Sequence, residues 1–367
     1  MDLYDRICKP TLLLNEAAAR RNIARMAEKA RAAGVEFRPH FKTHQSAAIG
    51  EWFRPLGVTR ITASSLEMAE YFAGAGWNDI TVAFPANLRE IDTINRLAGR
   101  IRLGLLVESA AAVDYLAARV QSPAQVWIKV NAGANRTGLG WSDPQAVVDL
   151  AQRIAARDGN LRFAGLLTHA GNTYSATGAE RVAVVYHESV ARMDALRRRV
   201  AESGLPCALS VGDTPGTTLV PDLGPVDEIR PGNFVFYDSH QYLRQVCRAE
   251  DVAVAVACPV VAHHPERGEI VVYGGAVHLS KDFVQDGDRR VYGLVALPTA
   301  DGWSEPLPGA YVRSLSQEHG ILAVPVADFE RFPIGSLAII LPAHSCLTVQ
   351  VMRKYMTLTG QEIDTLN

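Results

Sequence analysis

One lysine in the first part of the chain, Lys42, lies in a segment rich in imidazole groups. Lys42 follows a short apolar strand pattern that contains Arg38, and His40 and His44 flank it in the sequence. An amine in such a place can form a Schiff base with a carbonyl cofactor. A lysine beside a strand end is more often simply solvated, so this segment alone does not establish a cofactor site.

A second candidate segment, near the end of the chain, contains a histidine and a cysteine. His344 and Cys346 are two residues apart, and we expect them on one strand, where residues i and i+2 face the same side. Imidazole and thiolate together favour zinc. Two protein ligands would leave positions for water or substrate, which is the pattern of a catalytic metal site. The alternative is that Cys346 is a small apolar side chain in the core.

The composition is that of a folded protein without a strong charge bias. Of the 367 residues, 48% are apolar and 21% are charged, and the net charge is −2. These values give no electrostatic reason to expect a nucleic acid or an anionic membrane as a partner. No stretch approaches the roughly 20 apolar residues of a membrane span, and the N-terminus has no signal-peptide pattern. The five cysteines are odd in number and scattered, which predicts the cytoplasm.

The first two thirds of the chain alternate short apolar runs with segments of helical periodicity. Eight such units predict an α/β fold, a (β/α)8 TIM-type barrel, although an open doubly wound sheet would give a similar pattern. We place this barrel at residues 11–244. Its predicted strands are Phe37–Phe41, Arg60–Ala63, Ile80–Phe84, Arg102–Val107, Val126–Asn131, Phe163–His169, Ala208–Gly212 and Glu228–Phe236. The clearest predicted helices are Ala17–Ala33, Leu66–Ala75, Gln145–Ala156 and Glu180–Glu202.

The remainder of the chain, residues 245–367, has no long helical period. It predicts a C-terminal all-β domain that follows the barrel, and we expect residues 1–10 to pack with it. Glycine, proline and aspartate separate the β-rich runs, as turns require. The predicted runs are Val252–Val261, Glu269–Tyr273, Val291–Leu297, Ile321–Val326 and Ser336–Leu341.

Several polar residues fall at the carboxyl ends of the predicted barrel strands, where active sites of such barrels lie. Lys42 follows the first strand, Arg136 the fifth and His169 the sixth. Glycine-rich turns follow the seventh and eighth strands, and backbone N–H groups can approach a phosphate where no Cβ intervenes. Each part alone has an ordinary structural explanation. Together, an amine, a basic group, a stacking partner and a phosphate cradle are the parts of a pyridoxal phosphate site.

The segment Arg38–His44 resembles the lysine motif of the D-serine dehydratase and D-threonine aldolase family, and the similarity extends from about Thr11 to Val351. These proteins are fold-type III pyridoxal phosphate enzymes, related to the alanine racemase N-terminal barrel. They have an N-terminal barrel and a C-terminal β domain, and they often form dimers. The resemblance therefore implies that Lys42 holds pyridoxal phosphate, that its amine is the catalytic base, and that the protein is a homodimer.

The resemblance also implies roles for other residues at the strand ends. Arg136 would lie near the phenolic oxygen of the cofactor, His169 would stack on its ring, and Tyr174 would lie near its pyridine nitrogen. The phosphate-binding turns would include Gly212, Thr214, Gly216, Gly232 and Asn233.

His344 and Cys346 match the metal pair of the dehydratase members of the family, which bind zinc. Aldolase members tend to have aspartate at the second position and harder ions, so manganese or magnesium is the alternative metal. We expect a zinc-dependent lyase that converts a small D-amino acid with a β-hydroxyl group, D-serine first, to a 2-keto acid and ammonia. His344 counts as catalytic because its metal would act on the departing oxygen.

Other functions stay open at this point. The main alternative is D-threonine aldolase-like cleavage to glycine and an aldehyde, which the same residues would serve. An amino-acid racemase would need a second base, which the sequence does not single out. A non-enzymic pyridoxal phosphate carrier would need neither the β domain nor the metal pair. The segment Tyr273–His278 departs from the family pattern, so the identity of the D-amino acid is open.

Overall fold

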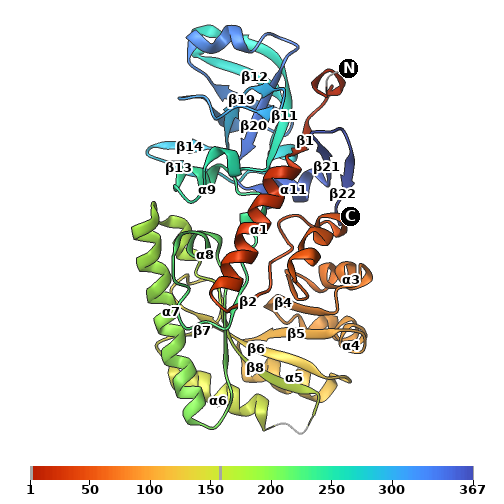
Figure 1. The fold of residues 1–367 in the computed structure, drawn as a ribbon, viewed down its shortest axis with the longest axis vertical. Helices are drawn as coiled ribbons and strands as arrows, with labels where there is room; N and C mark the ends of the chain where they lie inside the picture. Colours follow the sequence, from red (N-terminus) through yellow and green to blue (C-terminus); the bar gives the residue numbers. More distant parts are fainter. Residues whose placement is uncertain (1–2, 157–158, 367) are drawn as a thin grey trace. The chain divides into compact units, whose positions relative to one another are not determined.

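The computed structural model describes residues 3–156 and 159–366, which form two compact units (Figure 1). The barrel unit comprises Arg25–Lys42 and the described residues among Gly50–Gly232. The sheet unit comprises the described residues among Met1–Ala24, Thr43–Ile49 and Asn233–Asn367. The short segment after Lys42 therefore belongs to the sheet unit, although barrel residues precede and follow it in the sequence.

Among the described residues, the barrel unit is built on eight parallel strands in the order β2-β10-β9-β8-β6-β5-β4-β3. A parallel bridge between His40 and Thr62 joins the two ends of this order. The strands are β2 (Glu36–Phe37), β3 (Ile61–Ala63), β4 (Asp79–Pro85), β5 (Arg102–Val107), β6 (Ala124–Asn131), β8 (Leu161–Thr168), β9 (Ala208–Val211) and β10 (Glu228–Ile229), with the short β7 (Leu139–Gly140) paired to β6. The predicted TIM-type fold class is confirmed.

Helices lie outside the parallel strands, and polar side chains cap several of them (Figure 1). The hydroxyl of Ser65 accepts a hydrogen bond from the N–H of Met68 where α3 begins, and Ser109 does the same for Ala112 in α5. Such caps satisfy N–H groups that have no partner in the first helical turn. The helices are α3 (Leu66–Gly74), α4 (Ile91–Ala98), α5 (Ala110–Arg119), α6 (Pro144–Ala155), α7 (Ala179–Glu202) and α8 (Thr214–Leu219).

The sheet unit is built on strands in the order β12-β19-β18-β15-β20-β11-β1-β21-β22, and the apolar residues of β11 and β20 form its centre. Its neighbours are antiparallel except β1 and β21. The strands are β1 (Thr11–Leu14), β11 (Val254–His264), β12 (Glu269–Tyr273), β15 (Gly293–Ala296), β18 (Tyr311–Leu315), β19 (His319–Ala323), β20 (Leu337–Pro342), β21 (Lys354–Thr357) and β22 (Glu362–Asp364). Two short hairpins pair β13 (Val284–Asp286) with β14 (Arg289–Val291) and β16 (Pro298–Thr299) with β17 (Gly302–Trp303).

Helices also occur in the sheet unit, which the sequence predicted to be entirely β. They are α9 (Ser239–Leu243), α10 (Ala276–Leu279) and α11 (Ser345–Met352). In α11 the β-branched residues Thr348, Val349 and Val351 hide the helical pattern, because such residues favour strands where packing does not decide. Two helices, α1 (Glu16–Ala32) and α2 (Ala47–Gly50), contain residues of both units.

Several strands differ from those predicted. No strand was predicted at Thr11–Leu14, in a segment that the sequence assigned to the barrel, but β1 pairs there with β11 of the sheet unit, with Leu14 opposite Val254. A short apolar run does not specify which sheet it joins. The first barrel strand stops at Phe37, two residues before Pro39, and the last stops two residues before Pro231. Proline has no N–H to donate to a neighbouring strand, so both predicted strands were too long.

Within the part of the chain that the structure describes, none of the helices has the length and apolar character of a membrane span.

Candidate active site

Three of the predicted cofactor-binding residues lie after barrel strands and act on one another electrostatically. Lys42 follows β2, Arg136 follows β6 and His169 follows β8. Desolvation lowers the pKa of His169 well below its usual value, and the charges of Lys42, Arg136 and Arg230 lower it further. Burial, Lys42 and Arg230 act in the same way on the pKa of His40. The structure therefore brings these groups into one cluster of positive charge.

The ring of His169 is held by the protein backbone. Its Nδ1–H donates to the carbonyl oxygen of Gly212 across 2.5 Å, and Nε2 is then the unprotonated nitrogen of the neutral ring. The ring of Tyr174 lies 5.8 Å from that of His169, centroid to centroid. The hydroxyl of Tyr174 accepts a hydrogen bond from the N–H of Thr214 at 3.3 Å. Tyr174 therefore points at the turn to which the sequence assigned the phosphate.

The turn after β9 leads into α8, and Asp213 caps this helix. Its Oδ1 accepts a hydrogen bond from the N–H of Gly216 at 2.5 Å, so this N–H is already engaged within the turn. Burial raises the pKa of Asp213 to about 6. Both glycines of the turn are needed for packing, since a Cβ would lie 3.0 Å from the carbonyl oxygen of Arg230 at Gly212 and 2.3 Å from the ring of Tyr186 at Gly216.

The two predicted phosphate-binding residues after β10 have different surroundings. Gly232 is buried at the end of the barrel unit. The side chain of Asn233 lies in the sheet unit, where its Nδ2 donates to Asp238 at 2.7 Å and to the hydroxyl of Ser345 at 2.9 Å. The amide of Asn233 thus contacts the segment between His344 and Cys346.

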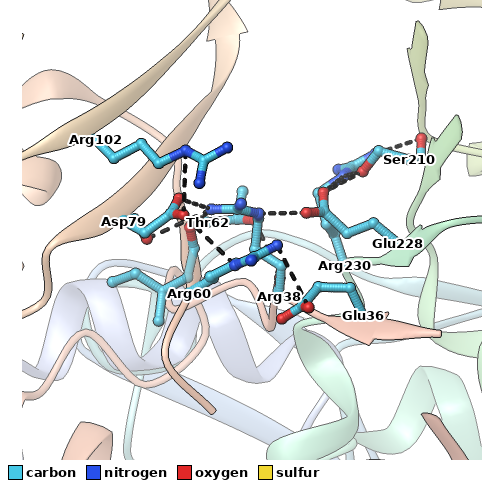
Figure 2. Close-up of polar contacts among 10 residues, drawn as sticks. Glu36, Arg38, Arg60, Thr62, Asp79, Arg102, Ser210, Glu228 and Arg230 are labelled. Carbon is cyan, nitrogen blue, oxygen red and sulfur yellow. Dashed lines mark hydrogen bonds and ion pairs between the residues drawn. The ribbon is translucent and has the colours of Figure 1, made fainter. Parts of the chain in front are cut away.

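A network of buried charges, which the sequence did not predict, lies inside the barrel unit (Figure 2). Glu228 is at its centre: one carboxylate oxygen accepts from Nε of Arg38 at 2.5 Å, and the other accepts from the hydroxyl of Ser210 at 2.5 Å. Arg38 also donates to Asp79 at 2.6 Å, and Nε of Arg230 donates to Ser210 at 2.6 Å. Figure 2 shows Arg60, Arg102 and Glu36 around the outer part of this network.

Arg230 connects this network to the strand end that carries His169. Its guanidinium donates to the backbone oxygen of Thr168 at 2.6 Å, and Thr168 directly precedes His169. Burial lowers the pKa of Arg230 to about 10, although Glu228 opposes this effect. Glu228 and Arg230 are two residues apart in a predicted strand, so their side chains were expected to point to the same side. This spacing was the signal that could have indicated a charge network.

Lys129, near the end of β6, is a buried lysine of the barrel unit that the sequence analysis missed. Its Nζ donates to the backbone oxygen of Val130 at 2.8 Å. Burial and the charges of Arg230 and Arg136 lower its pKa to about 7, although Glu108 opposes this effect. A charged residue within the apolar strand 126–130 was the signal that could have found it.

In the sheet unit, His344 and Cys346 lie where α11 begins. His344 is the N-cap residue and Cys346 is the second residue of the helix, because β20 already ends at Pro342. The expectation that they share a strand is therefore wrong, but Cys346 lies close enough to His344 to act on its pKa. Desolvation lowers the pKa of His344, whereas Cys346 and Asp282 together outweigh it and raise the pKa to about 11.

Other side chains of the sheet unit surround this pair. A carboxylate oxygen of Asp282 accepts from Nδ1 of His344 at 2.7 Å. The hydroxyl of Thr43 lies 3.3 Å from the sulfur of Cys346. The N-terminus of α11 also favours a thiolate, because the helix dipole places partial positive charge there.

The two groups of residues fit the charges of the two ligands that the sequence predicted. Lys42, Arg136 and Arg230 provide positive charge around His169, which suits a cofactor that carries a phosphate and a phenolic oxygen. His344 and Cys346 offer one imidazole and one thiolate, which is a donor set for zinc. Within residues 3–156 and 159–366, no cluster of three or more His, Cys, Asp and Glu side chains could hold a metal ion. The pair would therefore supply two protein ligands.

A parallel barrel with a lysine after its first strand, together with an antiparallel sheet unit, defines the fold of the fold-type III pyridoxal phosphate enzymes. Residues 14–240 match the family described as alanine racemase, N-terminal domain, and residues 253–358 match the putative serine dehydratase domain. The chain belongs to the family that combines these domains, as its sequence resemblance predicted.

Curated relatives match nearly the whole chain. D-threo-3-hydroxyaspartate dehydratase of Delftia sp. strain HT23 is 33% identical over 96% of this chain and 94% of its own length. D-serine dehydratase of Dictyostelium discoideum is 29% identical over 98% and 95%, respectively. D-threonine aldolase of Arthrobacter sp. is 28% identical over 94% and 87%. Dehydratases and aldolases are both lyases, so the predicted enzyme class is confirmed.

Solved structures of the Delftia enzyme are similar to this chain throughout. The enzyme has a TM-score of 0.90 at 32% identity, over 100% of this chain and 99% of its own. A cysteine-to-alanine variant in the metal-free form has a TM-score of 0.90 at 31% identity, over 100% and 99%. A histidine-to-alanine variant has a TM-score of 0.89 at 31% identity, over 98% and 95%. The two substituted positions are two residues apart in that enzyme.

Proposed function

We propose that this chain is a pyridoxal phosphate- and metal-dependent dehydratase that removes water from a D-amino acid with a β-hydroxyl group. The products would be a 2-keto acid and ammonia. The observation that carries this proposal is the position of His344 and Cys346, two residues apart where α11 begins, because an imidazole and a thiolate form a soft metal site that cofactor binding does not require. The similarity to two dehydratases over nearly the full length supports it.

Lys42 would hold the cofactor covalently and then act as the general base. Bound pyridoxal phosphate supplies an electron sink for the charge that forms at Cα of the substrate. The amine of Lys42 would take the proton from Cα. Arg136 would provide positive charge beside the cofactor, and His169, oriented by its bond to Gly212, would offer a ring face for stacking. Tyr174 would orient the turn at Thr214 through its hydroxyl.

His344 and Cys346 would hold the metal, most simply zinc, with manganese or magnesium as the alternatives. A bound metal supplies a Lewis acid for the β-hydroxyl group, which is otherwise a poor leaving group. Two protein ligands leave coordination positions for the substrate oxygen and for water. The spacing of the two substituted positions in the Delftia variants, one of which is metal-free, is the spacing of His344 and Cys346 and supports this assignment.

The assay that tests the function is a comparison of products. Purified protein loaded with pyridoxal phosphate and zinc is incubated with D-serine, D-threo-3-hydroxyaspartate, D-threonine and their enantiomers. We expect 2-keto acid and ammonia from the first two substrates and none from their enantiomers. Glycine and an aldehyde from D-threonine, without keto acid from any substrate, would replace the dehydratase with the aldolase alternative, which the 28% identity to a D-threonine aldolase favours as second candidate.

We also propose that the protein is a cytoplasmic homodimer. All five cysteines lie among the described residues and none of them forms a disulfide there, which agrees with a reducing compartment. Family members often form dimers, and light scattering coupled to gel filtration would give twice the chain mass of 39.8 kDa if this chain does so. A monomer mass at the concentration of the activity assay would contradict the dimer.

A further inference from the structure

We infer that Asp282 is a positioning residue for the metal ion, because it holds His344 in the orientation and tautomer that metal binding requires. This inference rests on the metal role proposed above for His344 and Cys346. The carboxylate of Asp282 accepts the Nδ1–H of His344 at 2.7 Å. A carboxylate cannot donate, so Nδ1 keeps its proton, and a metal ion would bind at Nε2 in place of the proton there.

The carboxylate of Asp282 is itself held by its own loop. Its Oδ1 accepts the backbone N–H of Phe283 at 3.0 Å, which leaves Oδ2 for His344. The N–H of Asp282 donates to the hydroxyl of Ser280 at 3.2 Å. Ser280 has a φ of 67°, in the left-handed region, and turns the chain directly after α10. The orientation of the carboxylate is therefore set before any metal binds.

The loop is also fixed to the helix that carries the cysteine. The hydroxyl of Thr348, in α11, donates to the backbone oxygen of Leu279 at 3.1 Å, and Leu279 is the last residue of α10. Asp282 is three residues further along the chain. A histidine and a carboxylate separated by 62 positions in sequence are thus brought together by the packing of α10 on α11.

A second carboxylate, that of the buried Asp238, also holds this turn. Oδ2 of Asp238 accepts the N–H of Ser345 at 3.1 Å and the side-chain N–H of Asn233 at 2.7 Å. Ser345 lies between the two proposed ligands, so their backbone is fixed as well as the imidazole. A metal-ligating histidine almost always donates its other N–H to a carboxylate, carbonyl or water, and losing that partner typically costs about 10- to 100-fold in metal affinity.

If His344 and Asp282 formed only a surface ion pair, the removal of Asp282 would have a different effect on metal affinity. The side chains of His344 and Asp282 are 37% and 45% exposed, and a pair so exposed contributes little to folding. If Asp282 serves only as such a partner, its removal changes neither metal affinity nor stability appreciably. Metal affinity therefore separates a positioning role from a surface contact.

The test compares metal affinity in three variants of the cofactor-loaded protein. Dissociation constants for zinc and for manganese are measured by competition with a chelator. We expect Asp282→Ala to weaken the binding of both metals by about 10- to 100-fold. Asp282→Asn should recover part of this loss, because its amide oxygen can still accept the Nδ1–H. The control is Asp286→Asn in the neighbouring hairpin, which removes an exposed carboxylate paired with Arg289 at 2.5 Å and should leave the affinity unchanged.

Two outcomes would overturn the inference, and they are distinguishable. In the first outcome the unsubstituted protein binds metal, and the dissociation constant of Asp282→Ala lies within about twofold of its value, far from the loss expected for such a partner. Asp282 is then not a positioning residue, and the proposed function stands. If the unsubstituted protein binds neither metal, the proposed metal role fails together with the inference. Thermal melting of each variant shows that the comparison is made between folded proteins.

Discussion

Replacing Glu228 by glutamine would test whether the charges inside the barrel unit act as one network. Glu228 is 4% exposed, and its carboxylate lies between the guanidinium groups of Arg38 and Arg230, which are 2% and 4% exposed. It accepts from Arg38 at 2.5 Å and lies 3.9 Å from Arg230. Glutamine has the same shape but no charge, so the substitution leaves the two buried cations with Asp79 as the counter-ion of Arg38.

The expected loss in the free energy of unfolding follows from the burial of these groups. Removing one partner of a buried ion pair typically costs about 3–5 kcal/mol, because it leaves an uncompensated buried charge. The amide oxygen of glutamine can still accept one hydrogen bond, so we expect the lower end, about 3 kcal/mol. For a unit of this size, about 1 kcal/mol shifts the melting temperature by roughly 2–4 °C. The melting temperature should therefore fall by roughly 6–12 °C.

Tryptophan fluorescence is a suitable probe of this unit. Four of the five tryptophans belong to the barrel unit, namely Trp52, Trp77, Trp127 and Trp141, and Trp303 belongs to the sheet unit. The matched control is Glu36→Gln, which removes a half-exposed carboxylate 3.4 Å from Arg60 and should cost less than about 1 kcal/mol. Equal melting temperatures for Glu228→Gln and Glu36→Gln would refute the argument.

Three further predictions concern single side chains. Lys42→Ala should leave less than about a thousandth of the activity, because it removes both the covalent link to the cofactor and the general base; borohydride reduction followed by peptide mapping should find the cofactor on Lys42, and label on another lysine would contradict the assignment. Cys346→Asp should shift the metal preference from zinc towards manganese or magnesium, since a hard ligand replaces a soft one; metal analysis after dialysis measures this shift, and an unchanged zinc content would count against it. His44 is fully buried, and burial lowers its pKa to about 3 from 6.5. The unfolded chain therefore binds the extra proton as pH falls below 6.5, and at pH 5 this site costs about 2 kcal/mol of stability; His44→Asn should flatten the fall in melting temperature between pH 7.5 and pH 5, and an equally steep fall would show that other groups dominate.

Strand positions in the barrel could be predicted because buried parallel strands are continuous apolar runs bounded by polar turns. Val126–Asn131 was predicted, and β6 spans Ala124–Asn131. Pairing partners could not be predicted in the same way. Leu12–Leu14 is a buried apolar run like any barrel strand, and only its partner β11 shows that it belongs to the sheet unit. Long-range pairing is decided by tertiary packing, which a local pattern does not record.

Residues at strand ends could be found from the sequence because the barrel brings all carboxyl ends to one side. Lys42, Arg136 and His169 were found by this rule, and the structure brings them into one charge cluster. Asp282 gave no such signal. It lies in a loop of the sheet unit, between two short elements, and meets His344 only because α10 packs on α11. Partners that orient a functional group through distant contacts are the part of a site that sequence patterns do not contain.

The motif that first identified the family illustrates why consecutive residues can have unrelated tasks. Arg38 belongs to the charge network of the barrel unit, and Lys42 belongs to the cluster at its strand ends. Thr43, the next residue, contacts the sulfur of Cys346 in the sheet unit. The backbone oxygen of His44 accepts the hydroxyl of Tyr355, also in the sheet unit. One short motif therefore contributes to the barrel core, the proposed cofactor site and the surroundings of the proposed metal ligand, so a substitution within it changes a different property at each position.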